Sequence, residues 1–443
     1  MNDIDDRFDR VRSVFPDHLG LARGKYLPAR IAGRGTGHCA SVWGLGYDRS
    51  LMPAPGSYLL DGLIDVVATP DHDTVRASWE DDVTAIAIAD VALDGEPFPF
   101  AARHVLQRAI AAWGELGCRP QVGIELEAYV LEPDVESPHG WRRLRNPRAL
   151  VYGTGIANDP GGVVDEIMRT ARRTGFRVES INAEFDESQY ELTLEYDDAL
   201  TAADDAFLFR VMAREVALAK GYDLTFLGLP FEGLSGSGVH VNLSLVDHDG
   251  NNLLLDASAD DGLSAVAKHA IAGLCHHHRS LAAIGAPTVN AYRRLQPASL
   301  SGYWANWGND HRCVANRVPT ARSAATRIES RVADGAANVH LAVAAVLTAA
   351  RLGVIGQLPC PEPESGDGFE EVNTDVAAPA DLAAALDHLE SAVDFTAALG
   401  QDVVDNFVAI KRAEWDRFVE AEERFDPAGP VTEWELNEYL GYH

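Results

Sequence analysis

Arginines are concentrated in one stretch of this sequence that runs from Asn290 to Arg331. Six of them stand at positions Arg293, Arg294, Arg312, Arg317, Arg327 and Arg331. A guanidinium group is a planar fork that matches two oxygens of a carboxylate or a phosphate at once. The stretch ends in alternation, and in a β-strand Arg327, Glu329 and Arg331 would share one face. A carboxylate between two guanidinium groups suits a site that binds anions and a metal ion better than it suits a core.

The overall charge of the chain argues that this cluster has a local ligand. The chain has 37 Lys and Arg against 67 Asp and Glu, a formal net charge of -30. Runs of charge are usually solvated surface, and that interpretation stays open for this stretch taken alone. In so acidic a chain, however, a cluster of arginines indicates an anionic partner. The charge also argues against nucleic acid or an acidic membrane as a partner, because both are polyanions.

Length and composition limit the possible architecture and the cellular compartment of the protein. At 443 residues the chain exceeds one ordinary core, so we expect two domains. No apolar run reaches the roughly 18–20 residues that span a bilayer, and the acidic start lacks the features of a signal peptide. The five cysteines are scattered without a CxxC pair, which is typical of reduced thiols. We therefore expect a cytoplasmic protein, whose acid-rich and lysine-poor composition suggests either a salt-rich cytoplasm or a GC-rich genome.

Hydrophobic periodicity changes near residue 100, where we place a domain boundary between residues 1–100 and 101–443. The first part is expected to be small and rich in strands. The elements expected along the chain are strands over 66–68 and 83–89, a helix over 101–116, a strand over 122–131, a helix over 160–174, two strands joined by a turn within 180–194, a helix over 202–221, an Ala-rich helix over 333–355, a mobile loop over 358–376, and helices over 380–399 and 402–424.

Two of the expected strands carry carboxylates where ordinary packing disfavours them. Glu125 and Glu127 alternate with apolar residues and share a face. Like charges side by side destabilise a strand unless water or a cation neutralises them. A half-exposed strand remains the alternative, but apolar residues at both parities favour a buried one. Glu184 and Glu191 would converge across the turn of the later strand pair.

A glycine-rich segment, Ser235-Gly236-Ser237-Gly238, leads into a strand in which His240, Asn242 and Ser244 share a face. Glycines let a backbone approach a ligand closely. A lone histidine is usually a satisfied core or surface residue, but the glycine-rich entry and the polar alternation favour a ligand role for His240. By contrast, the consecutive histidines at 276–278 would point in different directions from a helix, so we expect them at the surface and not in a metal site.

Five glutamates and one histidine together form a candidate metal site: Glu125, Glu127, Glu184, Glu191, Glu329 and His240. Carboxylates gathered in one pocket repel one another unless cations neutralise them. Oxygen-rich sites with one imidazole suit Mg²⁺ or Mn²⁺. Two such ions beside several arginines are the equipment of phosphoryl transfer. The residues alone thus predict a metal-dependent, ATP-using enzyme with an anionic second substrate.

In their order and spacing these motifs resemble glutamine synthetases, specifically the type I branch and its γ-glutamylamide ligase relatives. The resemblance covers nearly the whole chain and rests on Gly24-Lys25, Glu125-Leu126-Glu127, Asn182-Ala183-Glu184, Gln189-Tyr190-Glu191, Gly236-Ser237-Gly238-Val239-His240, Asn290-Ala291-Tyr292-Arg293-Arg294, Arg312, Arg317, Arg327-Ile328-Glu329-Ser330-Arg331 and Lys411-Arg412-Ala413-Glu414-Trp415. It implies an α+β protein, in which an N-terminal β-grasp domain precedes a catalytic α/β domain with an antiparallel active-site sheet. It also implies a homododecamer of two hexameric rings, with active sites between neighbouring subunits.

The resemblance implies a role for each site residue. The metal ligands would be Glu127, Glu184 and Glu191 for one ion and Glu125, His240 and Glu329 for the other. The glutamate-binding residues would be Gly236, Arg294 and Arg331. The nucleotide-binding residues would be Asn242, Ser244, Arg317 and Arg327. The catalytic arginines would be Arg294, Arg312 and Arg317. In the implied reaction, ATP activates the γ-carboxylate of glutamate as γ-glutamyl phosphate, from which a nitrogen nucleophile displaces phosphate.

Departures from the family pattern bear on the nitrogen substrate. True glutamine synthetases carry a glutamate soon after the Asn-x-Tyr-x-Arg motif, on a flap that helps to bind ammonium. Here that place holds Leu300. A carboxylate stabilises and deprotonates a small cation, and leucine does neither. The N-terminal segment that supplies the other ammonium carboxylate is not recognisable, and Asp48 is only a weak substitute for it.

The sequence therefore predicts an ATP-dependent ligase that joins the γ-carboxylate of L-glutamate to an organic amine. Polyamines such as putrescine rank first among the acceptors, ahead of ethanolamine and aromatic amines. One alternative is an ammonia-using glutamine synthetase that recruits its ammonium site from other residues. Another is a non-catalytic regulator of nitrogen status that binds nucleotide and glutamate. The complete set of metal ligands and arginines speaks against the regulator.

Overall fold

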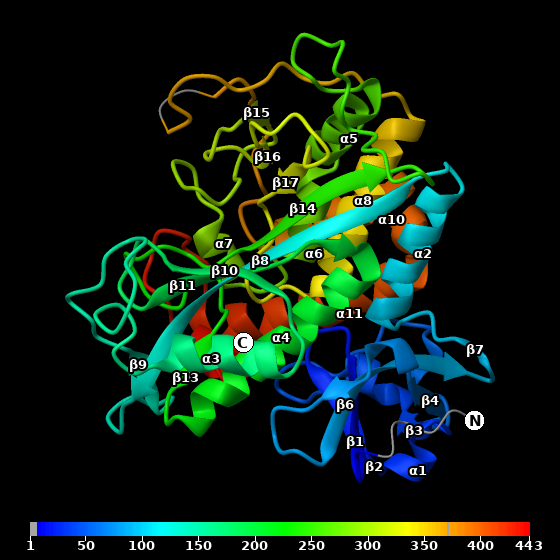
Figure 1. Cartoon of the computed structure of the whole chain (residues 1–443), viewed down its shortest axis with the longest axis vertical. Coiled ribbons are helices and arrows are strands. Elements are labelled where there is room, and N and C mark those ends of the chain that lie inside the picture. Colours follow the sequence, from blue (N-terminus) through cyan, green and yellow to red (C-terminus); the bar gives the residue numbers. More distant parts are fainter. Residues whose placement is uncertain (1–6, 370–371) are drawn as a thin grey trace.

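The computed structural model describes residues 7–369 and 372–443, and its strands form two sheets (Figure 1). The strands of the first sheet are β1 (Arg10–Pro16), β2 (Ala22–Pro28), β3 (Thr36–Cys39), β4 (Asp65–Pro70), β5 (Arg76–Ala77), β6 (Thr84–Leu93) and β7 (Glu96–Pro97). Their order is β2-β1-β6-β4-β3, with β5 and β7 also paired to β6. Strands β1 and β6 run parallel. The strands expected over 66–68 and 83–89 are confirmed as β4 and β6.

The second sheet carries the polar face described below. Its strands are β8 (Arg119–Pro133), β9 (Trp141–Arg143), β10 (Val178–Ala183), β11 (Gln189–Leu194), β12 (Asp197–Asp198), β13 (Asp223–Thr225), β14 (Val239–Val246), β15 (Trp307–Asn309), β16 (Asn316–Val318) and β17 (Ile328–Ser330). The main path is β10-β11-β8-β14-β17-β16-β15, and the other three strands pair with β8. All pairs except β15–β16 are antiparallel, so the expected antiparallel sheet is confirmed.

Helices cover the apolar face of the second sheet. They are α2 (Ala102–Gly114), α3 (Val163–Arg173), α4 (Ala199–Ala219), α5 (Ala265–His276), α6 (His278–Gly285), α7 (Ala291–Arg294), α8 (Val339–Ile355), α9 (Leu382–Ser391), α10 (Val393–Leu399), α11 (Gln401–Glu422) and α12 (Glu433–Tyr439), while the short α1 (Ala29–Ala32) lies beside β1. Figure 1 shows β8 and β14 running across the molecule, with α4 and α11 below them and α5 above them. The fold is therefore a mixed α and β fold, as expected.

Helix α8 forms the centre of the main core because its sequence is apolar all round. Glycines let it approach α5 closely: a Cβ on Gly273 would lie 2.2 Å from the carbonyl oxygen of Ala349. The side chain of Asn338 caps the helix by accepting a hydrogen bond from the backbone N–H of Leu341 at 3.2 Å. The expected helix over 333–355 is therefore six residues too long, because residues 333–338 form a buried connection that ends in this cap.

Two further expectations need correction. The helix expected over 380–399 is divided at Ala392 into α9 and α10. The histidines at 276–278 were expected at the surface, but His277 and His278 are buried where the chain turns from α5 into α6. Nε2 of His278 lies 3.1 Å from the carbonyl oxygen of Tyr303, and the ring of His277 packs against Phe395. The periodicity of one helix does not show that a second helix covers its end.

The loop over 358–376 has no helix or strand among its described residues, as expected. Residues 370 and 371 lie outside the described part of the chain. Glu364 is buried, and its carboxylate accepts hydrogen bonds from the side chain of Asn306 at 3.2 Å and the backbone of Asn373 at 2.8 Å. The mobility of this loop stays a prediction.

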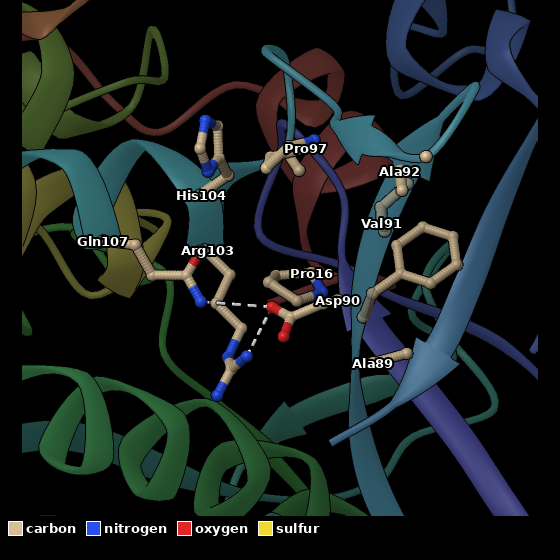
Figure 2. Close-up of a pocket in the computed structure, with 12 residues that line it drawn as sticks. Pro16, Ala89, Asp90, Val91, Ala92, Pro97, Arg103, His104 and Gln107 are labelled. Carbon is tan, nitrogen blue, oxygen red and sulfur yellow. Dashed lines mark hydrogen bonds and ion pairs between the residues drawn. The ribbon is translucent and has the colours of Figure 1, made fainter. Parts of the chain in front are cut away.

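The first sheet is held against the second by a buried arginine on α2. Arg103 donates hydrogen bonds to Asp71 and Asp90 at the first sheet and to Asp204 on α4. Figure 2 shows Asp90 facing both Arg103 and Gln107 across a small cavity of about 160 Å³. Since breaking the ion pairs of a buried guanidinium group is costly, this contact helps to hold the first sheet against the rest of the protein, as does the ion pair between Arg12 and Glu215.

Candidate active site

One face of the second sheet brings together the polar residues that were predicted from separate motifs. The even-numbered residues Val122, Ile124 and Leu126 of β8 are buried in the main core, so Glu125 and Glu127 point to the opposite face, as predicted. The strand register then sets their neighbours. The residues paired across strands are Glu127 with Glu191, Glu125 with Thr193 and His240, Asn242 with Glu329, and Glu329 with Arg317.

The first group on this face consists of Glu125, His240 and Glu329. One ligand atom from each lies within 4.8 Å of the others, close enough to surround one ion. Nδ1 of His240 lies 3.1 Å from Oε2 of Glu125 and 3.5 Å from Oε1 of Glu329. The other oxygen of Glu125 accepts a hydrogen bond from the Asn242 amide at 2.9 Å. The structure thus assembles all three residues predicted as ligands of one ion.

The second group consists of Glu127, Glu191 and again His240, also within 4.8 Å. Nε2 of His240 lies 3.8 Å from Oε1 of Glu127, so the two imidazole nitrogens face two groups of carboxylates. Glu184 was also predicted to belong here. The β10–β11 register places Asn182 opposite Glu191, but Glu184 is close enough for its charge to raise the pKa of Glu191. Glu184 follows the end of β10, where its carboxylate accepts a hydrogen bond from Asn182 at 3.3 Å.

The electrostatics of these groups show an excess of negative charge. Burial, and then the charge of Glu125, raise the pKa of Glu191 to about 7. Burial and the charge of Glu127 raise the pKa of Glu184. Burial also opposes ionisation of Glu125, but hydrogen bonding and attraction from His240 lower its pKa to about 2. Carboxylates that destabilise one another in a buried oxygen-rich site fit divalent cations such as Mg²⁺ or Mn²⁺.

Two arginines hold Glu329 from either side. Its Oε2 accepts a hydrogen bond from Arg317 at 2.9 Å, and its Oε1 accepts one from Arg331. Burial opposes ionisation of Glu329, yet Arg331 and His240 keep its pKa below the ordinary value. The predicted alternation of charge at this strand is confirmed. Nε of Arg331 is buried and has no hydrogen-bond partner among the described residues, so this guanidinium group retains a donor for a ligand.

Arg294 lies next to the glycine-rich segment. Its two terminal nitrogens donate to the carbonyl oxygens of Val332 at 3.2 Å and Arg331 at 3.1 Å, and within the described chain it makes no ion pair. A Cβ on Gly236 would lie 2.7 Å from Cγ of Arg294, and one on Gly238 would lie 2.4 Å from its NH2. Arg294 therefore leaves no room for a side chain at either glycine.

A cavity of about 670 Å³ opens at one end of this polar face. Its lining includes the predicted residues Asn242, Ser244 and Arg327, and also Glu125 and Glu191. Nε of Arg327 donates to Oδ1 of Asn242 at 3.0 Å. Sequence reasoning missed other lining residues, namely Arg119, Gln121, Thr193, Tyr196 and Asp198. In a strand every second side chain points to the same face, so counting back from Glu125 in steps of two is the one signal that could have indicated Gln121.

Three residues that the sequence singled out lie elsewhere. Arg312 is exposed and makes no hydrogen bond within the described part of the chain. Arg293 is buried and pairs with Glu435 of α12 at 2.8 Å, which makes it a structural anchor. The carboxylate of Asp48 accepts a hydrogen bond from Ser50 at 2.6 Å and lies 3.3 Å from Arg417.

Residues 100–439 match the family model described as the catalytic domain of glutamine synthetase. The chain therefore belongs to the glutamine synthetase family, whose members are ligases that form carbon–nitrogen bonds with ATP and divalent metal ions. The family combines glutamate with a nitrogen source. The fold and the site thus define the class of protein, and they agree with the expectation from the sequence motifs.

Individual relatives include enzymes for ammonia and for organic amines. The chain is 31% identical to a glutamine synthetase of Methanocaldococcus jannaschii, over 98% of this chain and 95% of the relative. It is 32% identical to a γ-glutamylethanolamide synthetase of Streptomyces coelicolor, over 97% and 92%. Among solved structures, an ADP complex of GmaS has a TM-score of 0.82 at 27% identity, and 98% of this chain and 97% of that chain are covered. Within the described residues, no helix is long and apolar enough to cross a bilayer.

Proposed function

We propose that this protein is a glutamate–amine ligase, which forms a γ-glutamylamide from L-glutamate, ATP and an organic amine. The observation that carries the proposal is the position of Leu300. This residue stands where glutamine synthetases carry the flap glutamate, and its carbonyl oxygen accepts a hydrogen bond from Arg331 at 3.2 Å. An apolar side chain, half exposed beside a substrate-binding arginine, can contact a carbon chain but cannot bind or deprotonate ammonium. The relative described as a γ-glutamylethanolamide synthetase supports the same choice.

The polar face divides into three parts in this proposal. The 670 Å³ cavity would take the nucleotide, with Asn242, Ser244 and Arg327 as its contacts. The centre would bind metal ions through Glu125, His240 and Glu329 on one side and Glu127, Glu191 and Glu184 on the other. The far end, with Gly236, Arg294 and Arg331, would take glutamate. Since Arg294 makes no ion pair within the described residues, its charge is available to the α-carboxylate of the substrate.

These carboxylates and His240 would hold divalent ions, whose positive charge would offset the repulsion between ATP and the incoming carboxylate. This fits the carboxylates whose pKa is raised, because a bound cation removes the cost of ionising Glu191 and Glu184 in a buried site. The chain's own residues position the ions and the substrates. Asn242 fixes Glu125, and the backbone N–H of Gly238 fixes Glu127 through a hydrogen bond of 2.6 Å.

The reaction would proceed in two displacements. In the first, a γ-carboxylate oxygen of glutamate bonds to the γ-phosphorus of ATP, and ADP leaves with the electrons of the broken P–O bond. In the second, the amine nitrogen bonds to the acyl carbon, the C–O bond breaks, and inorganic phosphate leaves while the nitrogen loses a proton. Arg317 lies beside Glu329 and would stabilise the transferring phosphoryl group. Arg312, exposed in this chain, would act only after its loop closes over the site.

Asp48 supports an organic amine as the acceptor. It was the weak candidate for a second ammonium carboxylate, but its carboxylate already accepts a hydrogen bond from Ser50 and forms an ion pair with Arg417 within the chain. We retain from the sequence the division into domains 1–100 and 101–443 and the assembly into two hexameric rings with active sites between subunits. Both belong to this proposal. Sedimentation velocity of the purified chain would test the assembly, since a monomer would contradict it.

The test of the proposed function measures phosphate release from ATP in the presence of glutamate and Mg²⁺. Separate reactions contain ammonium, methylamine, ethanolamine, putrescine or aniline, and mass spectrometry identifies each amide product. The proposal expects turnover with at least one organic amine at a kcat/KM about tenfold or more above that for ammonium. Turnover mainly with ammonium would identify an ammonia-using glutamine synthetase. Tight binding of ATP and glutamate without turnover of any acceptor would identify a regulator.

A further inference from the structure

We propose that Glu435, on helix α12, is a positioning residue for the binding of glutamate. This inference rests on the proposed function, because it concerns the end of the polar face that is assigned there to glutamate. Glu435 stands 142 residues after Arg293 in the chain, and no sequence motif connects it with the site. In the folded protein, hydrogen bonds lead from its carboxylate to both segments of the glutamate end, namely helix α7 and the glycine-rich segment.

The side chain of Glu435 has one fixed place at the start of α12. It is 0% exposed and forms a capping box with Thr432. Oε2 of Glu435 accepts a hydrogen bond from the backbone N–H of Thr432 at 2.9 Å, while the Thr432 hydroxyl accepts one from the backbone N–H of Glu435 at 3.2 Å. The end of the helix therefore holds the carboxylate in a position from which it can anchor its neighbours.

The first connection runs from Glu435 to helix α7, which carries Arg294. This helix is only four residues long, too short to be stable through its own backbone hydrogen bonds. Nε of Arg293 donates to both oxygens of the Glu435 carboxylate, at 2.8 and 3.0 Å. The NH1 group of Arg293 donates to the carbonyl oxygens of Asp426 at 2.6 Å and Gly429 at 3.0 Å. Because Arg294 is the next residue, these contacts set the point from which its side chain leaves the backbone.

The second connection runs through Asn290 to the glycine-rich segment. Nδ2 of Asn290 donates to Oε1 of Glu435 at 3.0 Å and to the carbonyl oxygen of Leu229 at 2.9 Å. Oδ1 of Asn290 accepts a hydrogen bond from the backbone N–H of Leu229 at 2.7 Å. The carbonyl oxygen of the preceding residue, Gly228, accepts one from the backbone N–H of Ser237 at 2.7 Å. One carboxylate thus helps to place both sides of the glutamate end.

The two connections meet at Arg294, which packs directly against Gly236 and Gly238. Among the described residues, Glu435 is the one carboxylate that forms an ion pair with Arg293. Without it, the buried Arg293 has no counter-charge, which is costly. A movement of α7 that exposes Arg293 to water relieves this cost but displaces Arg294. A displacement of about 1 Å in a substrate-positioning group can reduce catalysis by up to about 100-fold.

The test measures initial rates of Glu435→Gln with the nitrogen substrate that gives the fastest turnover, kept at saturation. We expect KM for glutamate to rise about tenfold and KM for ATP to stay within about twofold of wild type. Glu438→Gln is the matched control, since Glu438 lies on the same helix but pairs with Arg417 of α11, at 2.6 and 3.0 Å. Both variants should lose stability in urea, but only Glu435→Gln should change KM for glutamate.

A double-mutant cycle shows whether Glu435 acts through Arg294. In an Arg294→Lys background, Glu435→Gln should change KM for glutamate by less than about twofold, because the side chain that it positions is already altered. In an Arg331→Lys background the full effect of about tenfold should persist, since Arg331 contacts Glu329 and Leu300 instead. The same tenfold effect in both backgrounds would overturn the inference.

A second variant keeps the inference testable if Glu435→Gln does not fold. Asn290→Ala removes the connection to Leu229 and leaves the ion pair between Arg293 and Glu435 in place, and it should raise KM for glutamate about threefold. An unchanged KM for glutamate in both Glu435→Gln and Asn290→Ala, or an equal rise in Glu438→Gln, contradicts the inference. If Arg294→Lys itself leaves KM for glutamate unchanged, the glutamate end is assigned wrongly, and the proposed function fails at that point.

Discussion

Replacing Glu329 with glutamine should damage both the stability and the chemistry of this protein. The carboxylate is 1% exposed and is shared by Arg317 at 2.9 Å, by Arg331 and by His240 at 3.5 Å. The Glu329→Gln variant keeps the shape but removes the charge and turns an N–H₂ donor toward one of the donors around it. Removing one partner of a buried ion pair typically costs about 3–5 kcal/mol. Because glutamine retains one acceptor, we expect the lower end, about 3 kcal/mol.

The same substitution removes one of three ligands from a proposed metal site. Loss of several kcal/mol of transition-state stabilisation by the metal is expected, and about 3 kcal/mol corresponds to roughly a 150-fold fall in kcat/KM. Mg²⁺ should also stabilise the wild type against urea by mass action. In Glu329→Gln this increment should shrink at every Mg²⁺ concentration. Urea midpoints with and without Mg²⁺, together with phosphate release, measure both effects on the same samples.

A control separates this effect from a general loss of negative charge. Glu420 is exposed on α11 and makes no hydrogen bond or ion pair within the described chain, so Glu420→Gln changes the net charge equally but should leave midpoint and rate within error. If Glu329→Gln keeps the wild-type midpoint, its Mg²⁺ increment and its turnover, the reasoning about this face of the sheet is wrong. Destabilisation with normal turnover would leave Glu329 a structural residue only.

Three further predictions concern neighbouring residues. Glu191→Gln should stabilise the metal-free protein at pH 8 by about 2 kcal/mol. The pKa of Glu191 is raised to about 7 in the folded state, so the wild type loses stability as pH rises from 4.5 to 7. Urea midpoints at pH 5 and pH 8 should show the gain only at pH 8, and a gain at pH 5 would contradict this prediction. Arg331→Lys should raise KM for glutamate about tenfold by losing the planar fork, with KM for ATP nearly unchanged in initial-rate kinetics; equal rises in both would show a general distortion. Leu300→Glu should raise kcat/KM for ammonium about tenfold relative to that for the preferred organic amine. An unchanged ratio would show that Leu300 does not determine which nitrogen substrate is used.

Much of the site could be predicted from the sequence because strands have a fixed side-chain period. Glu125, Glu127, His240 and Glu329 were assigned to one site, and the register brings them together on one face. Alternation within a single strand is enough to determine which side chains share a face. What the sequence could not determine is the offset between strands. The β10–β11 register shows this limit, because no pattern in the sequence indicates that Asn182 is the residue opposite Glu191.

The rest of the site depends on contacts between distant segments. Tyr196 lines the cavity only because β11 and β12 both pair with β8, and no local pattern shows that pairing. The burial of His277 and His278 likewise depends on Phe395 and Tyr303, which lie far along the chain. Arg312 lies on a loop whose position follows from neither period nor charge. The fold class was easier to predict, because the apolar pattern of β8 indicates a strand and that of α8 indicates a helix.

A direct competition tests the central claim most simply. One reaction contains wild-type protein, ATP, Mg²⁺, glutamate and equal concentrations of ammonium, methylamine, ethanolamine, putrescine and aniline, and mass spectrometry measures the amount of each amide product at early times. The ratios of the products equal the ratios of the kcat/KM values. The account predicts that at least one γ-glutamylamide exceeds glutamine by about tenfold or more. A product that is mostly glutamine would contradict it and would make this protein an ammonia-using glutamine synthetase.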